Sequence, residues 1–145
     1  MIHPMKQLES EYPVILGQDI IWGDMDAFGH INNTVYFRYF EDARIAYFDH
    51  IGVHEQMKQF SVGPILATTQ CNFRLPLDYP DRINIATRAS LLSPKKFNME
   101  YVVFSERQGV IIAEGDGLIV YYDYANGKSC EIPDAIVAAI GALEG

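Results

Sequence analysis

Cysteine is scarce in this chain of 145 residues, whose two cysteines are Cys71 and Cys130. Two cysteines cannot support a disulfide-rich framework, and their spacing matches no pattern of metal ligands. Long apolar runs are also missing, because no stretch approaches the ~20 residues that a bilayer-spanning helix needs. The start of the sequence lacks the apolar run and the cleavage site of a signal peptide. We therefore expect a cytoplasmic protein with free thiols and no membrane partner.

Basic residues are few as well. The chain has 11 Lys and Arg against 19 Asp and Glu, which gives a formal net charge of −8. This balance argues against nucleic acid as the main partner, although a few local lysines can still hold a small anion. Hydrophobic residues make up 49% of the chain and the mean hydropathy is −0.01, as in ordinary soluble proteins. The length fits a single domain, residues 1–145, with a sizeable core.

The clearest periodicity in the chain lies in residues 33–50, which predict one long helix. Asn32 or Asn33 can cap its start, and Gly52 can end it. Its apolar side chains recur at helical spacing and form a largely aromatic stripe, which comprises Tyr36, Phe40, Ala43, Tyr47 and Ile51. So many aromatic side chains indicate a helix that other elements enclose.

Five segments are expected to be strands because they alternate or are rich in β-branched residues between turn signals. They are residues 14–22, 65–75, 83–92, 97–106 and 110–123. Within 65–75 the odd-numbered residues are expected to share one face. The remaining segments are an arm at 1–13, a polar linker at 53–63 and a short helix at 133–143.

The predicted fold is α+β, with a five-stranded antiparallel sheet wrapped around one long central helix. Gly115 and Gly117 interrupt the last strand, which indicates a bulge or a close backbone approach, and packing against that helix is favoured over ligand binding. A single curved sheet has unprotected edges, and pairing with a second copy is a natural remedy. We therefore expect a homodimer or a homotetramer.

The polar turn between the first strand and the long helix, residues 22–33, is the strongest candidate for a functional site. It places Asp26 and His30 near the helix start, where unpaired backbone N–H groups such as that of Asn33 can bind an oxyanion. Asp26 can serve as nucleophile or general base, and His30 as a general base. The alternative is structural, because aspartate suits turns, histidine can bond to backbone and asparagine caps helices.

Other charged residues have two interpretations each. Glu41 lies on the enclosed helix, where a carboxylate is costly unless it is paired or exposed. It is therefore a reserve catalytic candidate, or simply the partner of Arg44 three residues on. Basic residues on and beside the strand turns can hold phosphates or can be solvated charges, and these are Arg88, Lys95, Lys96 and Lys128.

The run from Trp22 to Asn33, with Tyr36, Tyr39, Phe40, Glu41 and Arg44 behind it, resembles the 4-hydroxybenzoyl-CoA thioesterase family of hotdog-fold proteins. The resemblance covers nearly the whole chain, and its pattern Asp-x-x-Gly-His-x-Asn-Asn is more specific for the superfamily than for a substrate. It implies a catalytic role for Asp26, a thioester carbonyl polarised by the backbone N–H of Asn33, and a coenzyme-side turn at residues 93–97. Some relatives carry histidine or tyrosine where Asn33 stands. A second branch uses a glutamate on the central helix, which keeps Glu41 in reserve.

The resulting prediction is an acyl-CoA thioesterase that releases a free acid and CoA. No metal or redox cofactor is implied, because CoA is part of the substrate. The side chains expected to bind substrate are Trp22, Phe28, Tyr36 and Phe37 around the acyl group and Arg88, Lys95 and Lys96 at the coenzyme.

Two other functions stay open on the sequence. A hydroxyacyl-thioester dehydratase of the same fold would use His30 and Glu41, although such enzymes usually show Gly-His-Phe-Pro where this chain has Gly29-His30-Ile31-Asn32. A non-catalytic module that binds acyl thioesters would need no nucleophile. Acyl carrier protein is an alternative carrier of the acyl group, which the net charge disfavours unless the mouth of the site is locally basic.

Overall fold

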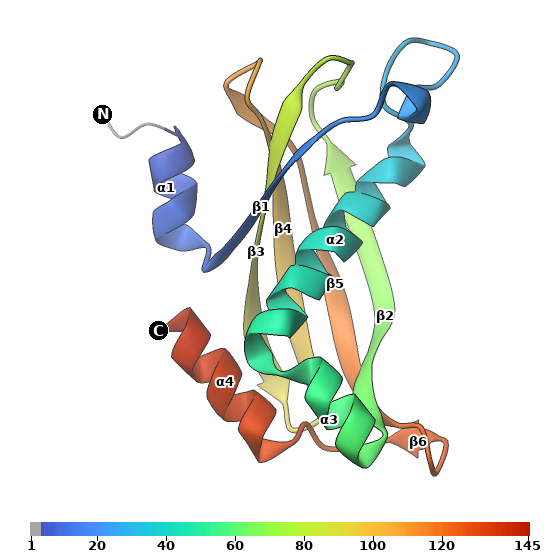
Figure 1. The fold of residues 1–145 in the computed structure, drawn as a ribbon, viewed down its shortest axis with the longest axis vertical. Helices are drawn as coiled ribbons and strands as arrows, with labels where there is room; N and C mark the ends of the chain where they lie inside the picture. Colours follow the sequence, from blue (N-terminus) through green and yellow to red (C-terminus); the bar gives the residue numbers. More distant parts are fainter. Residues whose placement is uncertain (1–3) are drawn as a thin grey trace.

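The computed structural model describes residues 4–145. A long helix lies across one face of a curled antiparallel sheet, and shorter helices stand at the two ends of the chain (Figure 1). The elements are α1 (Pro4–Glu11), β1 (Val14–Asp19), the 3₁₀ turn η1 (Trp22–Asp24), α2 (Asn33–Ile51), α3 (Val53–Phe60), β2 (Val62–Phe73), β3 (Arg82–Ser93), β4 (Lys96–Ser105), β5 (Val110–Asp123), β6 (Lys128–Ser129) and α4 (Asp134–Glu144).

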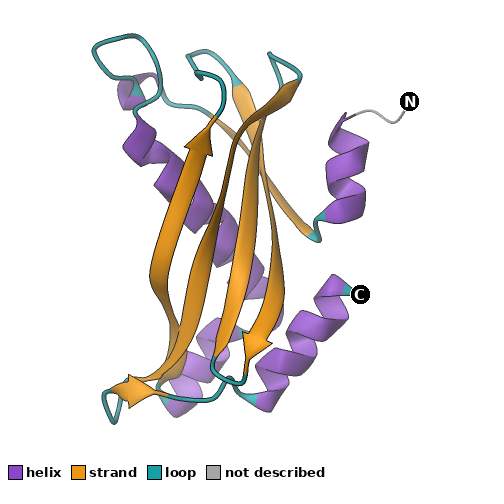
Figure 2. Cartoon of the chain, turned by 180° about the vertical axis from the view of Figure 1, so that it is seen from behind, coloured by secondary structure: helices purple, strands orange, loops and turns teal. Residues whose placement is uncertain are grey.

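The sheet has the strand order β1-β3-β4-β5-β2, with the two-residue β6 paired to β5. All pairings are antiparallel. Seen from behind, the sheet presents its outer face while α2 crosses the other face, and β2 runs along one edge (Figure 2). The predicted α+β fold, a five-stranded sheet around one long helix, is confirmed, with β6 as a short addition.

Helix α2 begins and ends where the sequence predicts. The Asn32 side chain accepts the N–H of Thr34 at 3.0 Å, and Gly52 ends the helix with a φ of 80°. Such a positive φ is easiest for glycine. The predicted aromatic stripe is confirmed, since all its members are buried against the sheet, and these are Tyr36, Phe40, Ala43, Tyr47 and Ile51.

The first strand is shorter than predicted. β1 ends at Asp19, and the η1 turn begins at Trp22. The reason is pairing: the ladder of β1 with β3 runs from Val14 opposite Thr87 to Asp19 opposite Arg82, where β3 itself begins. Residues beyond Asp19 have no opposite strand, so Trp22 does not continue the sheet.

Two segments predicted to be irregular contain helices. The described part of the arm forms α1, whose Leu8 packs on the outer face of the sheet. The linker 53–63 contains α3, which buries Val53 and is followed by its cap residue Ser61 with a φ of 56°. Both helices have eight residues and bury few side chains. Helices this short are stabilised mainly by packing against the rest of the fold. The spacing of apolar residues in the sequence therefore gives little indication of them.

The predicted face pattern of β2 is confirmed beyond one position, where Cys71 and Phe73 share the inner face, and is wrong before it, where Leu66 and not Ile65 packs on the core. The ladder between β2 and β5 shifts between Leu66 and Thr68, as at a β-bulge. One extra residue reverses which side chains face the core. Leu66 and Cys71 both pack against the core although they are five residues apart. The bulge therefore sets which side Phe73 presents at the end of the strand.

Candidate active site

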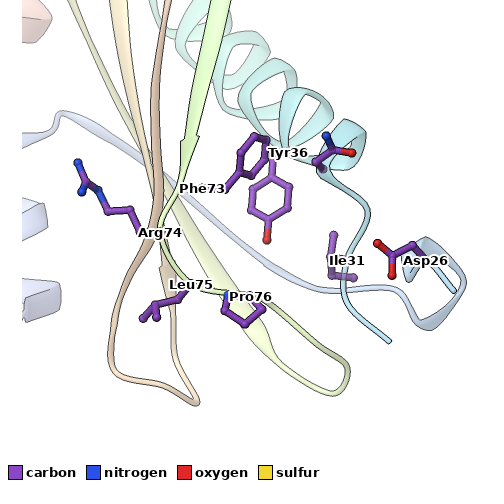
Figure 3. A pocket seen from close by; sticks show the side chains of 8 residues that line it. Asp26, Ile31, Tyr36, Phe73, Arg74, Leu75 and Pro76 are labelled. Carbon is purple, nitrogen blue, oxygen red and sulfur yellow. The ribbon is translucent and has the colours of Figure 1, made fainter. Parts of the chain in front are cut away.

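A cavity of about 320 Å³ lies between the start of α2, the loop before it and the end of β2 (Figure 3). Three predicted site residues, Asp26, Asn33 and Tyr36, meet there. The remaining walls come from the loop and from the chain that leaves β2, and they are Ile31, Phe73, Arg74, Leu75 and Pro76. Most of the lining residues are apolar and a few polar groups converge among them, which is the usual composition of a small-molecule site.

The loop from Met25 to Ile31 closes on itself. These two residues form an antiparallel bridge, and the Asp26 N–H donates to the His30 carbonyl oxygen at 2.7 Å. Gly29 has a φ of 81°, a backbone conformation that glycine adopts at little cost. The loop is anchored to the sheet because the Ile31 N–H donates to the Leu77 carbonyl oxygen at 2.7 Å. Asp26 therefore has a defined place beside the helix start.

The Asp26 carboxylate accepts backbone hydrogen bonds through only one of its two oxygens. Oδ1 accepts the backbone N–H of Phe28 at 2.8 Å and that of His30 at 3.4 Å. Within residues 4–145, Oδ2 makes no hydrogen bond. The turn-forming interpretation of Asp26 is thus correct for one oxygen, and the other oxygen is available to a bound molecule.

The first backbone N–H of α2 is also available. The N–H of Thr34 donates to the Asn32 side chain, and the N–H of Val35 donates to the Asn32 carbonyl oxygen. In the part of the chain that the structure describes, the N–H of Asn33 has no acceptor. Unpaired N–H groups and the helix dipole together favour a negative charge at this end of α2.

Aromatic rings form the wall opposite the loop. The rings of Tyr36 and Phe73 meet edge to face with centroids 5.0 Å apart, while the Tyr39 ring contacts Tyr36 at 5.8 Å from outside the cavity. Burial raises the pKa of the Tyr36 hydroxyl to about 12, and the neighbouring Cys71 adds to the rise. At neutral pH the hydroxyl is therefore a hydrogen-bond donor.

Several predicted acyl-pocket and acid–base residues lie elsewhere. Trp22, Phe28 and Phe37 are exposed, and none of them lines this cavity in the single chain. His30 takes part in the site through its backbone. Glu41 is exposed on α2 and outside the cavity, so the pair His30 and Glu41 that a dehydratase would need is not assembled around it.

The alternative role of Glu41, an ion pair with Arg44, is not observed among the described residues. Arg44 turns inward, where it is buried and donates to the Tyr101 hydroxyl at 3.1 Å. Glu41 makes no ion pair within residues 4–145.

The predicted phosphate-binding residues divide into two places. Arg88 lies on the outer face of the sheet, where its side chain pairs with Glu100 at 2.7 Å and covers the Tyr12 ring. Lys95 and Lys96 stand at the β3–β4 turn, at the end of the sheet opposite the cavity (Figure 1). The 12 residues of β3 separate the two ends by roughly 40 Å.

The sequence did not single out the β2 side of the cavity. Phe73, Leu75 and Pro76 are 47 to 50 residues from Asp26 along the chain, and only the folded sheet brings them together. Phe73 and Leu75 are 47% and 43% exposed despite being large and apolar. The one available signal was the alternation of this strand, which places Phe73 on the same face as the core residue Cys71.

The curled sheet, the enclosed helix and the polar loop at the helix start define a hotdog-type fold. The sequence pattern of the Thioesterase-like superfamily matches residues 20–140, and the chain belongs to this superfamily. The match confirms the predicted family and the predicted enzyme class, a hydrolase that acts on thioester bonds.

Solved structures and curated relatives agree with this assignment. A thioesterase from Thermus thermophilus, complexed with coenzyme A and Zn, is 30% identical with a TM-score of 0.81, covering 93% of this chain and 96% of that one. A 1,4-dihydroxy-2-naphthoyl-CoA thioesterase from Synechocystis shares the fold at 14% identity, with a TM-score of 0.81 over 91% of this chain and 98% of that one. The long-chain acyl-CoA thioesterase FadM of Escherichia coli K12 is 24% identical over 97 residues, which are 67% of this chain and 72% of FadM.

No helix among residues 4–145 combines the length and the hydropathy that crossing a bilayer requires. Cys71 and Cys130 are both free thiols in the structure.

Proposed function

We propose that the protein hydrolyses acyl-CoA thioesters at the cavity beside α2, with Asp26 and the Asn33 N–H as its reacting groups. One observation carries this proposal: a carboxylate with a free oxygen and a helix-start N–H without an acceptor, both within the described residues 4–145, border the same cavity. Thioester hydrolysis needs a nucleophile or base on one side of the carbonyl and an electrophilic donor for its oxygen.

In the proposed reaction the thioester carbonyl oxygen accepts a hydrogen bond from the Asn33 N–H. Asp26 Oδ2 then attacks the carbonyl carbon, or removes a proton from a water that attacks it. Either attack converts the carbonyl oxygen into an oxyanion at the positive end of the helix dipole. Collapse of this intermediate re-forms the C=O bond and expels the CoA thiolate. Where Asp26 attacks directly, water then hydrolyses the acyl-aspartate to the free acid.

Coenzyme A is the carrier that the comparisons favour, because the Thermus relative is complexed with it and the Synechocystis and Escherichia coli relatives are named for CoA substrates. Acyl carrier protein stays an alternative. A chain with a net charge of −8 would repel an acidic carrier unless the mouth of the site were locally basic.

The working unit that we propose is a homodimer, or a tetramer built from such dimers. β2 pairs only with β5, so one edge of this strand has no paired strand within residues 4–145. The middle of β2, Ala67 to Gln70, is exposed, and apolar Phe73 lies at its end. A second copy that pairs antiparallel along this edge would satisfy the free backbone groups and cover the apolar ones.

This dimer also gives Lys95 and Lys96 a role. An antiparallel β2 pairing turns the partner end for end, which brings its β3–β4 turn to the end where this chain holds Asp26. The two lysines would then supply the basic charge that the coenzyme phosphates need in an acidic protein.

A panel of acyl-CoA substrates with a thiol-trapping dye tests the proposed function directly. The expected result is release of CoA from at least one acyl class at a rate proportional to the protein concentration. Tight binding of acyl-CoA with no thiol release across the panel would favour a binding module instead. Hydration of an enoyl-CoA, followed by its absorbance, would favour the dehydratase.

A further inference from the structure

The Tyr36 hydroxyl is a polar group of the cavity that the mechanism above leaves without a task. The side chain is only 3% exposed, and its hydroxyl has no hydrogen-bond partner within residues 4–145. Figure 3 shows the hydroxyl pointing away from α2 into the space between Ile31 and Pro76. Polar groups on side chains this buried are usually hydrogen-bonded, and here a molecule in the cavity can supply the acceptor that the described chain does not.

A comparison with Tyr39 shows that the Tyr36 hydroxyl is not merely sealed in the core. The Tyr39 hydroxyl is also unpaired among the described residues, but it is completely enclosed. The Tyr36 hydroxyl, in contrast, is not enclosed, and it can be reached from the cavity that Tyr36 lines. Tyr39 lines a different, smaller cavity beside Gln18 and Asp42. A molecule bound next to Asp26 can therefore reach the first hydroxyl and not the second.

Helix geometry places Tyr36 and Asn33 on the side of α2 that borders the cavity. The two residues are three apart, which places them on the same face of α2. Helical side chains lean toward the N-terminus, so the Tyr36 ring leaves α2 on the side of the preceding turn, and its hydroxyl stands in the cavity that Asn33 also lines. The edge-to-face contact with Phe73, at 85° between the ring planes, holds the ring in this direction.

We propose that the Tyr36 hydroxyl donates a second hydrogen bond to the thioester oxygen, beside the Asn33 N–H, and stabilises the oxyanion. The inference rests on the proposed thioesterase activity and adds a donor to it. Attack on the carbonyl carbon moves the C=O electron pair onto oxygen, and two donors then share that charge. The Tyr36 proton stays on its own oxygen throughout, since re-formation of C=O expels the CoA thiolate and returns the electron pair.

The test is Tyr36→Phe, which removes only the hydroxyl, with Tyr39→Phe as the matched control. Loss of one oxyanion donor lowers kcat by about 10²-fold or more in enzymes of acyl transfer. We expect Tyr36→Phe to lower kcat by at least about 10-fold on every accepted acyl-CoA with little change in KM, because the lost bond strengthens only in the transition state. Tyr39→Phe should keep the wild-type kcat.

A ring-fluorinated tyrosine at position 36 gives a second measurement that does not depend on how well the phenylalanine variant folds. Fluorination makes the hydroxyl a stronger donor at nearly unchanged shape, so kcat should equal or exceed that of the wild type. A kcat that falls to the level of Tyr36→Phe would overturn the proposal.

Three further outcomes would overturn it: an unchanged kcat in Tyr36→Phe, a rise in KM alone, or a loss limited to acyl groups that carry their own oxygen substituents. A loss limited to those acyl groups would mean that Tyr36 binds the acyl substituent and determines substrate specificity. Failure of the proposed function looks different, because the wild type would then release no CoA. An inactive Asp26→Asn beside a fully active Tyr36→Phe would remove Tyr36 from the mechanism and leave the thioesterase in place.

Discussion

Gly115 of β5 lies so close to Phe40 of α2 that a Cβ on the glycine would stand 2.5 Å from the Phe40 ring. The same Cβ would stand 2.3 Å from the carbonyl oxygen of Gln70 on the neighbouring strand. Phe40 is fully buried, and the Gln70 carbonyl belongs to the paired backbone, so neither can move aside at low cost. The prediction of helix packing is confirmed for Gly115, whereas a Cβ on Gly117 would meet Leu66 of β2 and Tyr101 of β4 instead of the helix.

Gly115→Ala should therefore lower the free energy of unfolding by about 1–3 kcal/mol or more, the usual cost of an overpacked core. Urea unfolding followed by circular dichroism measures it. Gly141→Ala is the matched control, because nothing lies within 4 Å of its Cβ in helix α4. Alanine is the better helix former, so the control should gain up to about 1 kcal/mol. Equal stability of the two variants would contradict the packing account.

Asp26→Asn should lower kcat by about 10²-fold or more, since the amide keeps the shape but loses the charge and the basicity. The loop should survive because the asparagine Oδ1 can still accept the Phe28 N–H. The control is Asp24→Asn, whose carboxylate pairs with Arg38 at 3.6 Å outside the cavity. Initial rates of CoA release compare the two. Near-normal turnover in a folded Asp26→Asn protein would transfer the catalytic role to Glu41 as the next candidate.

The double change Lys95→Ala and Lys96→Ala should raise KM for acyl-CoA several-fold at low salt and less at high salt, because exposed ion pairs are weak, at ~0.2–1 kcal/mol each, and screened. Turnover at saturation should hardly change, since the lysines touch no reacting atom. An acyl-pantetheine, which lacks the nucleotide, should not distinguish the variant from the wild type. Lys6→Ala, an exposed lysine on α1, is the control. Equal damage to both substrates would point to a structural role for the turn.

The β2 edge predicts a mass of at least two chains, so light scattering at micromolar protein should give well over the 16.4 kDa of a monomer. Ala67→Lys places a charge in the exposed middle of β2, where lysine discourages edge pairing. We expect this variant to shift toward the monomer and to lose activity together with the assembly. A monomeric wild type with full activity would refute the dimeric site.

High pH should destabilise the protein through its buried tyrosines. The pKa of Tyr36 rises from 10.0 to about 12, and burial also raises the pKa of Tyr39 and Tyr121. Below pH 10 these groups are protonated in both the folded and the unfolded protein, so stability is complete there. Above it the unfolded chain ionises first, and stability falls until the folded groups ionise as well.

Urea midpoints measured between about pH 8 and pH 11 test this fall. Tyr39→Phe should make the decline shallower, because one buried phenol no longer takes part. Tyr79→Phe, at a residue 47% exposed, should leave the slope unchanged. A flat stability curve through this range would contradict the burial of the phenols.

The long helix and the succession of strands along the chain were predictable because their signals are local. Asn32, the stripe around Phe40 and Gly52 mark α2 without any knowledge of the sheet. The switch of faces between Leu66 and Thr68 was not predictable, since a bulge depends on how the strand pairs with β5.

The candidate site divides in the same way. Asp26 and Asn33 share one short motif, whereas Phe73 reaches them only through the folded sheet. The availability of the Asn33 N–H, within the described residues, follows from the cap geometry of its neighbours Asn32 and Thr34. Residue types in a motif can suggest such a donor, but only the hydrogen bonds of the folded chain show that it is unused.

Helix α1 covers apolar surface on the sheet, so its removal should affect the solubility of the protein. Its Leu8, with Tyr12 just beyond it, lies over a small apolar patch on the outer face of the sheet, made of Ala86, Val102 and Phe104. A shortened chain that began at β1 would keep every wall of the Asp26 cavity and yet expose that patch to water. Such a protein would retain its chemistry but lose colloidal solubility, so precipitation on trimming should not be mistaken for loss of the fold.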